Sequence, residues 1–535
     1  MAADRLGAVV VAVVAGLAAI GQAAADGAVG WTDQEIRVVL NSDIRSTNLG
    51  VNRDGNTDTV MHHIVEGLVA FREDLSVAPM LAERYAVLDD GRTYRFHLRR
   101  GVRFHNGAEM TAEEVKWSYD RLLDPATRHR CADLFNGRTP ISARIVSVAV
   151  VDRHTVDLTL AEPTPIFLTS LANTQCNLGI LHPGSLDDDG TWRAPVGTGP
   201  YRLAEWRRGE YILLERFDGY RPRGGGKDGY AGRRDPIARH LRFLIIPDAA
   251  VAIAAVQVGE ADLMPALPPN MIEGARRRTD LTFQDQELLS WNVLLMRPDD
   301  PTLANPDLRR AIAHAIDIDA VAEFATVGLG RANPSAHSPA LPGYSDVHLR
   351  RPAYDPGEAR RLLRQAGYRG ERLVIQTNKR FPTMYDNAVV IHAMLTAAGI
   401  HAEIEVLDYA TQLSNFFSGT FQLSAFAYSG RAHGAIRYAN FIGPRAQNAR
   451  YQWDSPRAFA LATRAFAQAD SPALAGVLEE MHLAMLEDLP LIGLYNDHEV
   501  SMSVATLEGY RGWPLGRPRL WGVWKRDRTG AREGN

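Results

Sequence analysis

Cysteine is scarce in this chain of 535 residues, which holds only Cys131 and Cys176. Metal binding by these two residues alone is not expected, because structural zinc sites use four ligands, and we predict no metal site. In an exported protein an isolated cysteine pair is compatible with a disulfide, whereas two buried thiols are the alternative. We therefore name Cys131 and Cys176 as a possible disulfide.

The chain also lacks an excess of charge of one sign. Its 59 Lys and Arg against 63 Asp and Glu give a formal net charge of -4 and a pI near 6.5. This balance provides no basic field for nucleic acid, and we expect no nucleic-acid partner. Hydrophobic residues make up 46% and charged residues 23%, which is a normal globular mixture in a chain long enough for two or three domains.

Long apolar runs are absent except at the N-terminus, where one extends from Leu6 to Ile20 and is followed by Ala23-Ala24-Ala25. The run is short for a membrane-spanning helix, and the alanines fit a cleavage site. We expect a signal peptide over residues 1–25, with an uncleaved anchor as the alternative. No cysteine follows the site, so we expect a periplasmic protein without a lipid anchor.

Catalytic motifs are missing as well. The sequence contains no Gly-x-Ser-x-Gly, His-Glu-x-x-His or Ser-x-x-Lys motif and no dinucleotide-binding glycine fingerprint. We therefore predict that the protein is not an enzyme and needs no cofactor. An exported hydrolase remains the competing hypothesis, because missing motifs do not exclude catalysis.

The clearest local pattern lies in the stretch RTYRFHLRRGVRFHNGAEMTAEEV, which begins at residue 92. Tyr94, Phe96 and Leu98 alternate with basic residues, which predicts a strand with one buried face. Glycine-containing turns and a second short strand are expected next. Thr111 and Glu114 have capping-box spacing, which predicts the start of a helix.

The residue pattern of this stretch resembles the signature block of the family 5 solute-binding proteins, which serve peptide and nickel ABC importers. The resemblance is carried by Tyr94, Phe96, Leu98, Arg99, Gly101, Val102, Phe104, His105, Gly107, Thr111, Ala112, Val115 and Ser118. The segments PVGTGPY (195–201) and IPDAAVAIAAVQVGEADLM (246–264) are also similar to the family pattern.

The resemblance implies an α/β, bilobed periplasmic-binding-protein fold of type II and the large cluster C type, with an additional subdomain in the first lobe. Alternating strand and helix patterns independently favour α/β lobes. Chain crossings near residues 284–290 and 487–491 would form a hinge. We expect a first-lobe core of 26–60, 196–285 and 488–524, an extra subdomain of 61–195, a second lobe of 286–487 and a disordered tail of 525–535.

Candidate ligand-binding residues follow from the same resemblance. In the dipeptide-binding branch an arginine after a second-lobe strand binds the peptide carboxylate, and Arg380 occupies the comparable place. An exposed strand-end arginine is the alternative. The family also has an aspartate, shortly after a tryptophan, that accepts the peptide amino terminus. Here Tyr428 lies near the tryptophan position, and Arg431 or His433 near the aspartate position.

An arginine in place of that aspartate would repel a free amine, so the sequence favours a ligand with an anionic group, such as an opine-like or phosphorylated compound. His433 leaves a nickel chelate as a further possibility. Asn41 and Asp43 follow a short β-branched run and could present polar groups to a cleft, with a plain turn as the alternative. Trp291 completes the set of candidate ligand-binding residues.

The resemblance implies a periplasmic substrate-binding component that captures a peptide or peptide-like solute. We expect a monomer that delivers this solute to an ABC permease and ATPase complex at the inner membrane. Binding without turnover would distinguish it from a hydrolase.

Overall fold

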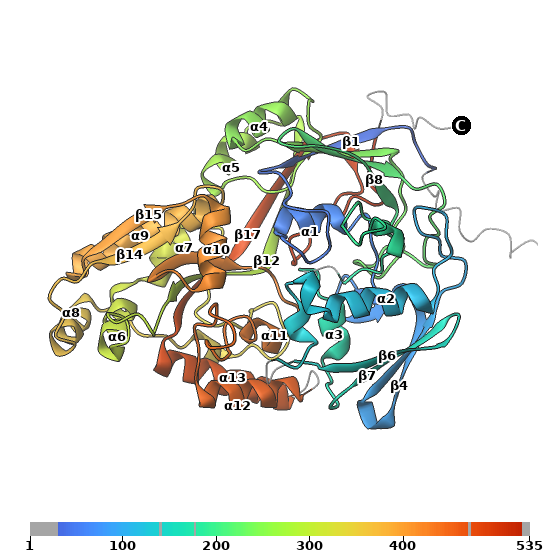
Figure 1. Cartoon of the computed structure of the whole chain (residues 1–535). Coiled ribbons are helices and arrows are strands. Elements are labelled where there is room, and N and C mark those ends of the chain that lie inside the picture. Colours follow the sequence, from blue (N-terminus) through green and yellow to red (C-terminus); the bar gives the residue numbers. More distant parts are fainter. Residues whose placement is uncertain (1–29, 139–141, 176–177, 469–471, 527–535) are drawn as a thin grey trace, which may run out of the picture.

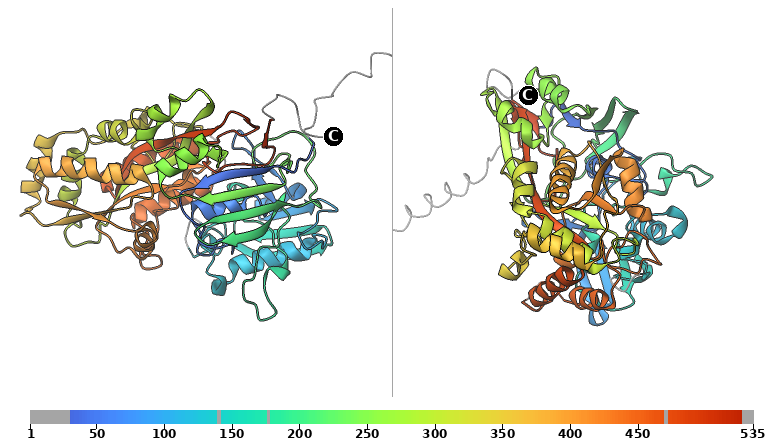
Figure 2. Two further views of the ribbon diagram at one scale, coloured as in Figure 1. Left: turned by 90° about the horizontal axis from the view of Figure 1, so that it is seen from above. Right: turned by 90° about the vertical axis from the view of Figure 1, so that its left-hand side faces the viewer.

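Two long antiparallel strands, β12 (Leu281–Met296) and β17 (Leu491–Val504), join the two lobes of the molecule. They run through one large sheet with the strand order β15-β14-β16-β12-β17-β11-β1-β10-β9-β8, and β13 pairs with β17. Figures 1 and 2 show the lobes on either side of this strand pair. The computed structural model describes residues 30–138, 142–175, 178–468 and 472–526.

Three predictions lie partly or wholly outside these residues. They concern the signal peptide over 1–25, the pairing of Cys131 with Cys176, and the tail beyond 526. Cys131 is buried, whereas Cys176 is not among the described residues, so the disulfide stays a prediction. Lys525, where the tail was expected to begin, instead pairs with Leu507 in a short strand.

The second lobe contains parallel strands covered by helices. β14 pairs in parallel with β15 and β16, and β16 pairs antiparallel with β12. The elements are α6 (Pro306–Ala315), α7 (Ile318–Thr326), β13 (Arg331–Ala332), α8 (Pro356–Gln365), β14 (Leu373–Thr377), α9 (Pro382–Ala398), β15 (Ala402–Val406), α10 (Tyr409–Ser418), β16 (Leu423–Tyr428), α11 (Gly434–Tyr438), α12 (Pro456–Phe466) and α13 (Pro472–Asp488). One apolar core joins the sheet to α6, α7, α8 and α9.

The first lobe is built around β1, which pairs in parallel with β10 and β11. β9 and β8 extend the sheet antiparallel beyond β10. The elements are β1 (Glu35–Leu40), α1 (Gly55–Met61), β8 (Tyr201–Arg207), β9 (Tyr211–Arg216), β10 (His240–Ile245), α4 (Ala249–Gln257), β11 (Leu263–Met264), α5 (Pro269–Arg276), β18 (Leu507–Glu508) and β19 (Trp524–Lys525). Together with the other lobe, this arrangement confirms the predicted bilobed α/β class.

A separate four-stranded antiparallel sheet, with the order β4-β5-β7-β6, lies within the range predicted as an extra subdomain. It has its own apolar core and appears at the lower right of Figure 1. The elements are β2 (Val69–Phe71), β3 (Val77–Pro79), β4 (Ala82–Leu88), β5 (Thr93–Leu98), α2 (Ala112–Leu123), β6 (Ile145–Asp152), β7 (Thr155–Leu160) and α3 (Phe167–Leu171). Short 3-10 turns occur at Asp89–Gly91, Pro125–Thr127, Ala132–Leu134, Pro183–Ser185 and Asp346–Leu349.

The signature stretch folds largely as its pattern predicts. β5 buries Tyr94, Phe96 and Leu98. Thr111 and Glu114 form the predicted capping box at the start of α2, with the Thr111 backbone N–H donating to Oε2 of Glu114 at 2.8 Å. The predicted second strand is reduced to an isolated bridge between residues 103 and 109. The turns use positive φ angles of +71° at Gly101 and +87° at Gly107, where a side chain would be strained.

The crossing between the lobes lies at a register break in the long strand pair. Glu287 of β12 stands opposite His498, and Trp291 stands opposite Asn496. Three residues of β12, 288–290, therefore face the single residue Asp497. The start of β17 packs in the second-lobe core through Leu494 and its neighbours. The second crossing thus lies about ten residues beyond the predicted 487/488 boundary, because the helical end of α13 leads into a strand that first completes the second-lobe sheet.

Candidate functional site: a cleft between the lobes

A cavity of about 110 Å³ lies between the two lobes. Its first-lobe wall comes from the start of α1 and from loops around residues 130–134 and 173–175. Its second-lobe wall comes from α10, the end of β16 and the segment around α11. Ligand sites commonly form where two lobes meet, because contacts with both sides can favour closure.

Aromatic side chains from the second lobe form the apolar part of the cavity wall. The aromatic lining residues are Tyr409, Phe416, Phe417, Phe426 and Tyr428. The Phe416 and Phe426 rings stack with centroids 4.6 Å apart. The hydroxyl of Tyr428 donates to Oε1 of Gln452 at 2.9 Å, and burial raises the pKa of Tyr428. This wall is therefore a fixed apolar surface with a satisfied polar group.

The Arg380 contact links the lobes directly. Arg380 follows β14, and its Nη1 donates to Oδ2 of Asp54 at 2.8 Å. Its Nε also donates to Oδ1 of Asn41 at 3.4 Å. Asp54 caps α1 by accepting from the Thr57 backbone N–H at 2.9 Å. Burial would raise the pKa of Asp54, but Arg380 and this hydrogen bond hold it below its usual value. The carboxylate beside Arg380 thus comes from the protein itself.

Arg431 has a different environment. It lines the cavity, is 5% exposed and forms no ion pair with any described residue. Its guanidinium donates to the carbonyls of Ser429 and Gly430 at 3.2 and 2.9 Å, whereas its buried Nε has no hydrogen-bond partner among the described residues. Burial, with Arg437 and Arg53 nearby, lowers its pKa well below the ordinary value. A buried cation without a counter-charge is costly, which favours an anion beside it.

Three further arginines line the same cavity. Arg53 pairs with Asp58, its Nε donating to Oδ1 at 2.8 Å. Arg450 lies 4.0 Å from the carboxylate of Asp133. Arg130 forms no ion pair with the described residues, and its guanidinium lies 4.1 Å from the ring centroid of Phe417. The lining is therefore more cationic than anionic.

The remaining candidate residues make structural contacts, and the structure does not place them on the cavity wall. Asp43 accepts from Trp206 Nε1 at 2.9 Å and from the Gly209 backbone at 3.0 Å. His433 caps α11 by accepting from the Ala435 N–H.

Trp291 is buried in the second lobe and donates from Nε1 to the Asn333 carbonyl at 2.9 Å. Its ring stacks at 6.3 Å on that of Tyr428. Asn41 reaches the cleft only through Arg380. Of the seven candidates, Tyr428 and Arg431 line the cavity, and Arg380 contacts the cavity-lining Asp54.

Sequence reasoning missed the other charged cavity residues, Arg53, Asp54, Arg130, Asp133 and Arg450. They come from three separate parts of the chain, residues 53–54, 130–133 and 450, and none belongs to a quoted motif. The one local signal was Asp54, whose spacing to Thr57 fits a helix cap. The fold alone brings these charges together.

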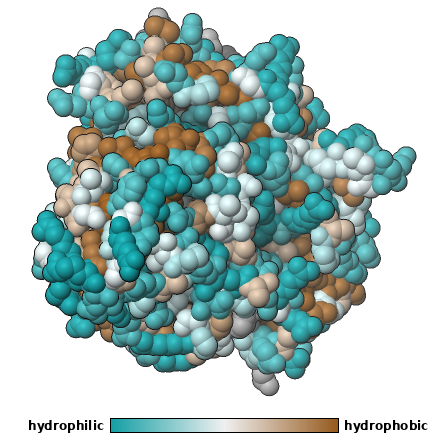
Figure 3. All heavy atoms as spheres, turned by 60° about the vertical axis from the view of Figure 1, so that its left-hand side comes forward, coloured by the Kyte–Doolittle hydropathy of each residue, from teal (hydrophilic) through white to brown (hydrophobic). Residues whose placement is uncertain are grey.

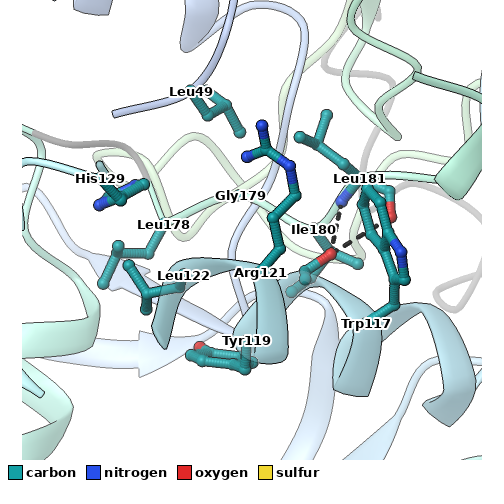
Figure 4. Close-up of a pocket in the computed structure, with 11 residues that line it drawn as sticks. Leu49, Trp117, Tyr119, Arg121, Leu122, His129, Leu178, Gly179, Ile180 and Leu181 are labelled. Carbon is teal, nitrogen blue, oxygen red and sulfur yellow. Dashed lines mark hydrogen bonds between the residues drawn. The ribbon is translucent and has the colours of Figure 1, made fainter. Parts of the chain in front are cut away.

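A second, smaller pocket of about 30 Å³ lies within the first lobe between α2 and residues 178–181. Figure 4 shows Trp117 and Arg121 rising from α2 beside Ile180 and Leu181. This volume holds little more than a water molecule. Among the described residues, no group of three His, Cys, Asp or Glu side chains could hold a metal ion.

The surface is mostly hydrophilic on the face drawn in Figure 3, with scattered hydrophobic patches. In the part of the chain that the structure describes, no helix is long and apolar enough to cross a membrane. Two α/β lobes around a lined cleft are the arrangement expected of a ligand-binding protein.

Comparison with known proteins identifies the family. The model of the bacterial extracellular solute-binding proteins, family 5, matches residues 76–447, and the chain belongs to this family. It is 27% identical over 378 residues to the glutathione-binding protein GsiB of Salmonella choleraesuis, covering 70% of each chain.

Solved structures show the same fold. The periplasmic binding protein DppA of Helicobacter pylori, in complex with the peptide STSA, has a TM-score of 0.82 at 23% identity. The match covers 92% of this chain and 98% of that one. AgaA of A. tumefaciens R10, in complex with agropinic acid, has a TM-score of 0.80 at 22% identity over 92% and 99% of the chains.

Proposed function

We propose that this protein is the periplasmic substrate-binding component of an ABC importer. It captures a peptide-like or opine-like solute carrying an anionic group between its lobes and delivers it to an inner-membrane permease and ATPase complex. The family assignment supports solute binding. The relatives' printed ligands, glutathione, a peptide and agropinic acid, support a small acid or peptide as the ligand class.

The single observation that carries the anionic ligand is the environment of Arg431. This guanidinium is buried on the cavity wall and has no carboxylate partner among the described residues. An anionic ligand group would supply the missing counter-charge and accept its unused hydrogen bonds. A free-amine ligand gains nothing from Arg431, because the two cations repel each other.

The nickel-chelate alternative has less support, because His433 caps a helix and is not among the cavity-lining residues. The hydrolase alternative predicts product formation, whereas a binding protein gives saturable binding without turnover. We expect a monomer, which size-exclusion chromatography with light scattering would test.

The decisive experiment is mass spectrometry of small molecules released by denaturing protein purified from its native periplasm. We expect one acidic solute in stoichiometric amount, and calorimetry with that solute should show saturable binding and no product. Release of a chemically altered solute would favour the hydrolase. Absence of any bound or binding solute would contradict the proposal.

Closure can be tested separately. The long strands β12 and β17 cross between the lobes at residues 288–290 and 497, so we expect hinge closure on the solute. Small-angle scattering should show a smaller radius of gyration with the identified solute than without it.

A further inference from the structure

The cationic groups around the cavity fall into two sets when each is matched with its nearest carboxylate. Arg53 is matched by Asp58, and Arg450 by Asp133. Arg380, which lies beside the cavity, is matched by the cavity-lining Asp54. Each of these three pairs carries no net charge while its carboxylate is ionised.

Two arginines of the lining are left without a carboxylate in the described chain. Arg130 belongs to the first lobe and Arg431 to the second. The exposed Arg130 lies over Phe417, a second-lobe residue, at 4.1 Å from the ring centroid, so it stands at the contact between the lobes. Arg431 is buried. The positive charge of Arg53 helps to lower the pKa of both Arg130 and Arg431.

We propose that the solute carries two anionic groups, one bound by Arg431 in the second lobe and the other by Arg130 in the first. This inference rests on the proposed function and specifies the chemical class of its ligand, a dicarboxylate or a compound with a carboxylate and a phosphate. The two anionic groups neutralise one unmatched cation on each lobe. The solute thus bridges the lobes electrostatically.

The same arrangement makes closure depend on the charge of the solute. Closing the cleft brings Arg130 toward the arginines of the second lobe, and like charges in a partly desolvated space repel. A dianion removes this repulsion from both sides, whereas a monoanion leaves one lobe unmatched. Discrimination between dianions and monoanions of the same shape is therefore built into the closed state.

The test uses matched pairs of solutes that differ by one carboxylate. Calorimetry would compare glutathione with its monoethyl ester, and N-acetyl-L-glutamate with N-acetyl-L-glutamine, with the dipeptide Met-Leu as a zwitterion. We expect at least one diacid to bind at least tenfold more tightly than its matched monoacid. A monoacid or Met-Leu binding as tightly as the diacids would overturn the inference and leave solute binding intact.

If no compound of the panel binds, the test is the number of anionic groups on the solute released from the native protein. Two anionic groups on it support the inference, and one or none overturns it. Absence of any released solute overturns the proposed function itself, so the two failures are distinguishable.

Variants assign the two positions. Arg130→Gln and Arg431→Gln should each reduce the preference for the diacid to about twofold or less, whereas Arg84→Gln, at an exposed arginine of β4 without an ion pair among the described residues, should leave it unchanged. Because Arg431 is buried, Arg431→Lys serves as a second variant that keeps the charge, and thermal unfolding checks each fold. A preference retained in Arg130→Gln, or in a correctly folded Arg431→Gln, would overturn the assignment. If Arg431→Gln does not fold, a preference retained in Arg130→Gln still overturns it.

Discussion

At the Arg380 contact a guanidinium from the second lobe meets the carboxylate of Asp54 from the first, whereas at Arg431 no carboxylate of the described chain is present. Both arginines are largely buried. A paired cation stabilises closure with or without solute, whereas an unmatched cation makes closure depend on solute. Arginine thus has two roles in one cleft, joining the lobes at Arg380 and binding the solute at Arg431. The two roles differ only in whether a protein carboxylate lies beside the guanidinium.

Arg380→Ala should give the largest effect. It leaves Asp54 buried in the closed form without its cation, and removing one partner of a buried ion pair typically costs about 3 to 5 kcal/mol. Calorimetry with the solute released from the native protein should show affinity reduced by well over tenfold. The double variant Asp54→Asn with Arg380→Ala should recover much of the loss, and a double variant as weak as the single one would contradict the pairing.

Arg431→Gln should weaken binding of the same solute by about 2 to 5 kcal/mol, because it removes the counter-charge of a desolvated anionic group. Unlike the Arg380 case, removing a protein carboxylate cannot rescue it. Near-native affinity in a correctly folded Arg431→Gln would show that the two arginines do not differ in role, and that the ligand group lies elsewhere.

The pH dependence of binding should report on Arg53, which is matched only while Asp58 is ionised. Burial raises the pKa of Asp58 to about 7, although Arg53 opposes the shift. As pH falls through about 7, Asp58 takes up a proton and Arg53 becomes an additional unmatched cation. We therefore expect affinity for the anionic solute to rise as pH falls from 8 to 6, with proton uptake on binding. Asp58→Asn should abolish this slope, measured by calorimetry in buffers of different ionisation enthalpy.

The smallest effect is expected at Arg84→Gln, the matched surface control. Arg84 is exposed on β4 and forms no ion pair with described residues, and such substitutions usually change stability by less than about 0.5 kcal/mol. Affinity for the solute and the temperature of unfolding should both stay at wild-type values. A large loss of affinity here would mean that long-range charge, rather than the cleft contacts, controls binding.

The sequence predicted the fold more fully than the site. The alternation of Tyr94, Phe96 and Leu98 and the Thr111 capping box are local patterns, and local patterns determine local structure. The boundary at 487/488 was misplaced, because the residues after α13 complete the second-lobe sheet before the chain returns. Which sheet these residues join depends on their pairing with the distant strand β12, and no local sequence pattern encodes that pairing.

The candidate site was predicted only at positions where the sequence resembles the family pattern. Arg431 and Tyr428 follow a recognisable strand end, and both line the cavity. Arg380 contacts the cavity-lining Asp54, and this carboxylate partner lies 326 residues away in the sequence. Arg53 and Arg130 lie in irregular segments, and only the folded chain shows that they line the same cavity as Arg431.

The register break between β12 and β17 restricts how the molecule can move. Paired strands continue on both sides of residues 288–290, so the lobes cannot drift apart as they would on a flexible linker. The break itself is anchored, because the Leu289 N–H donates to the Pro514 carbonyl at 2.7 Å and Ser290 Oγ donates to Asp497 at 2.7 Å. Opening is thereby reduced to bending and twisting of one two-stranded ribbon, a motion of the microsecond-to-millisecond class. Solute release would then follow one reproducible path rather than many.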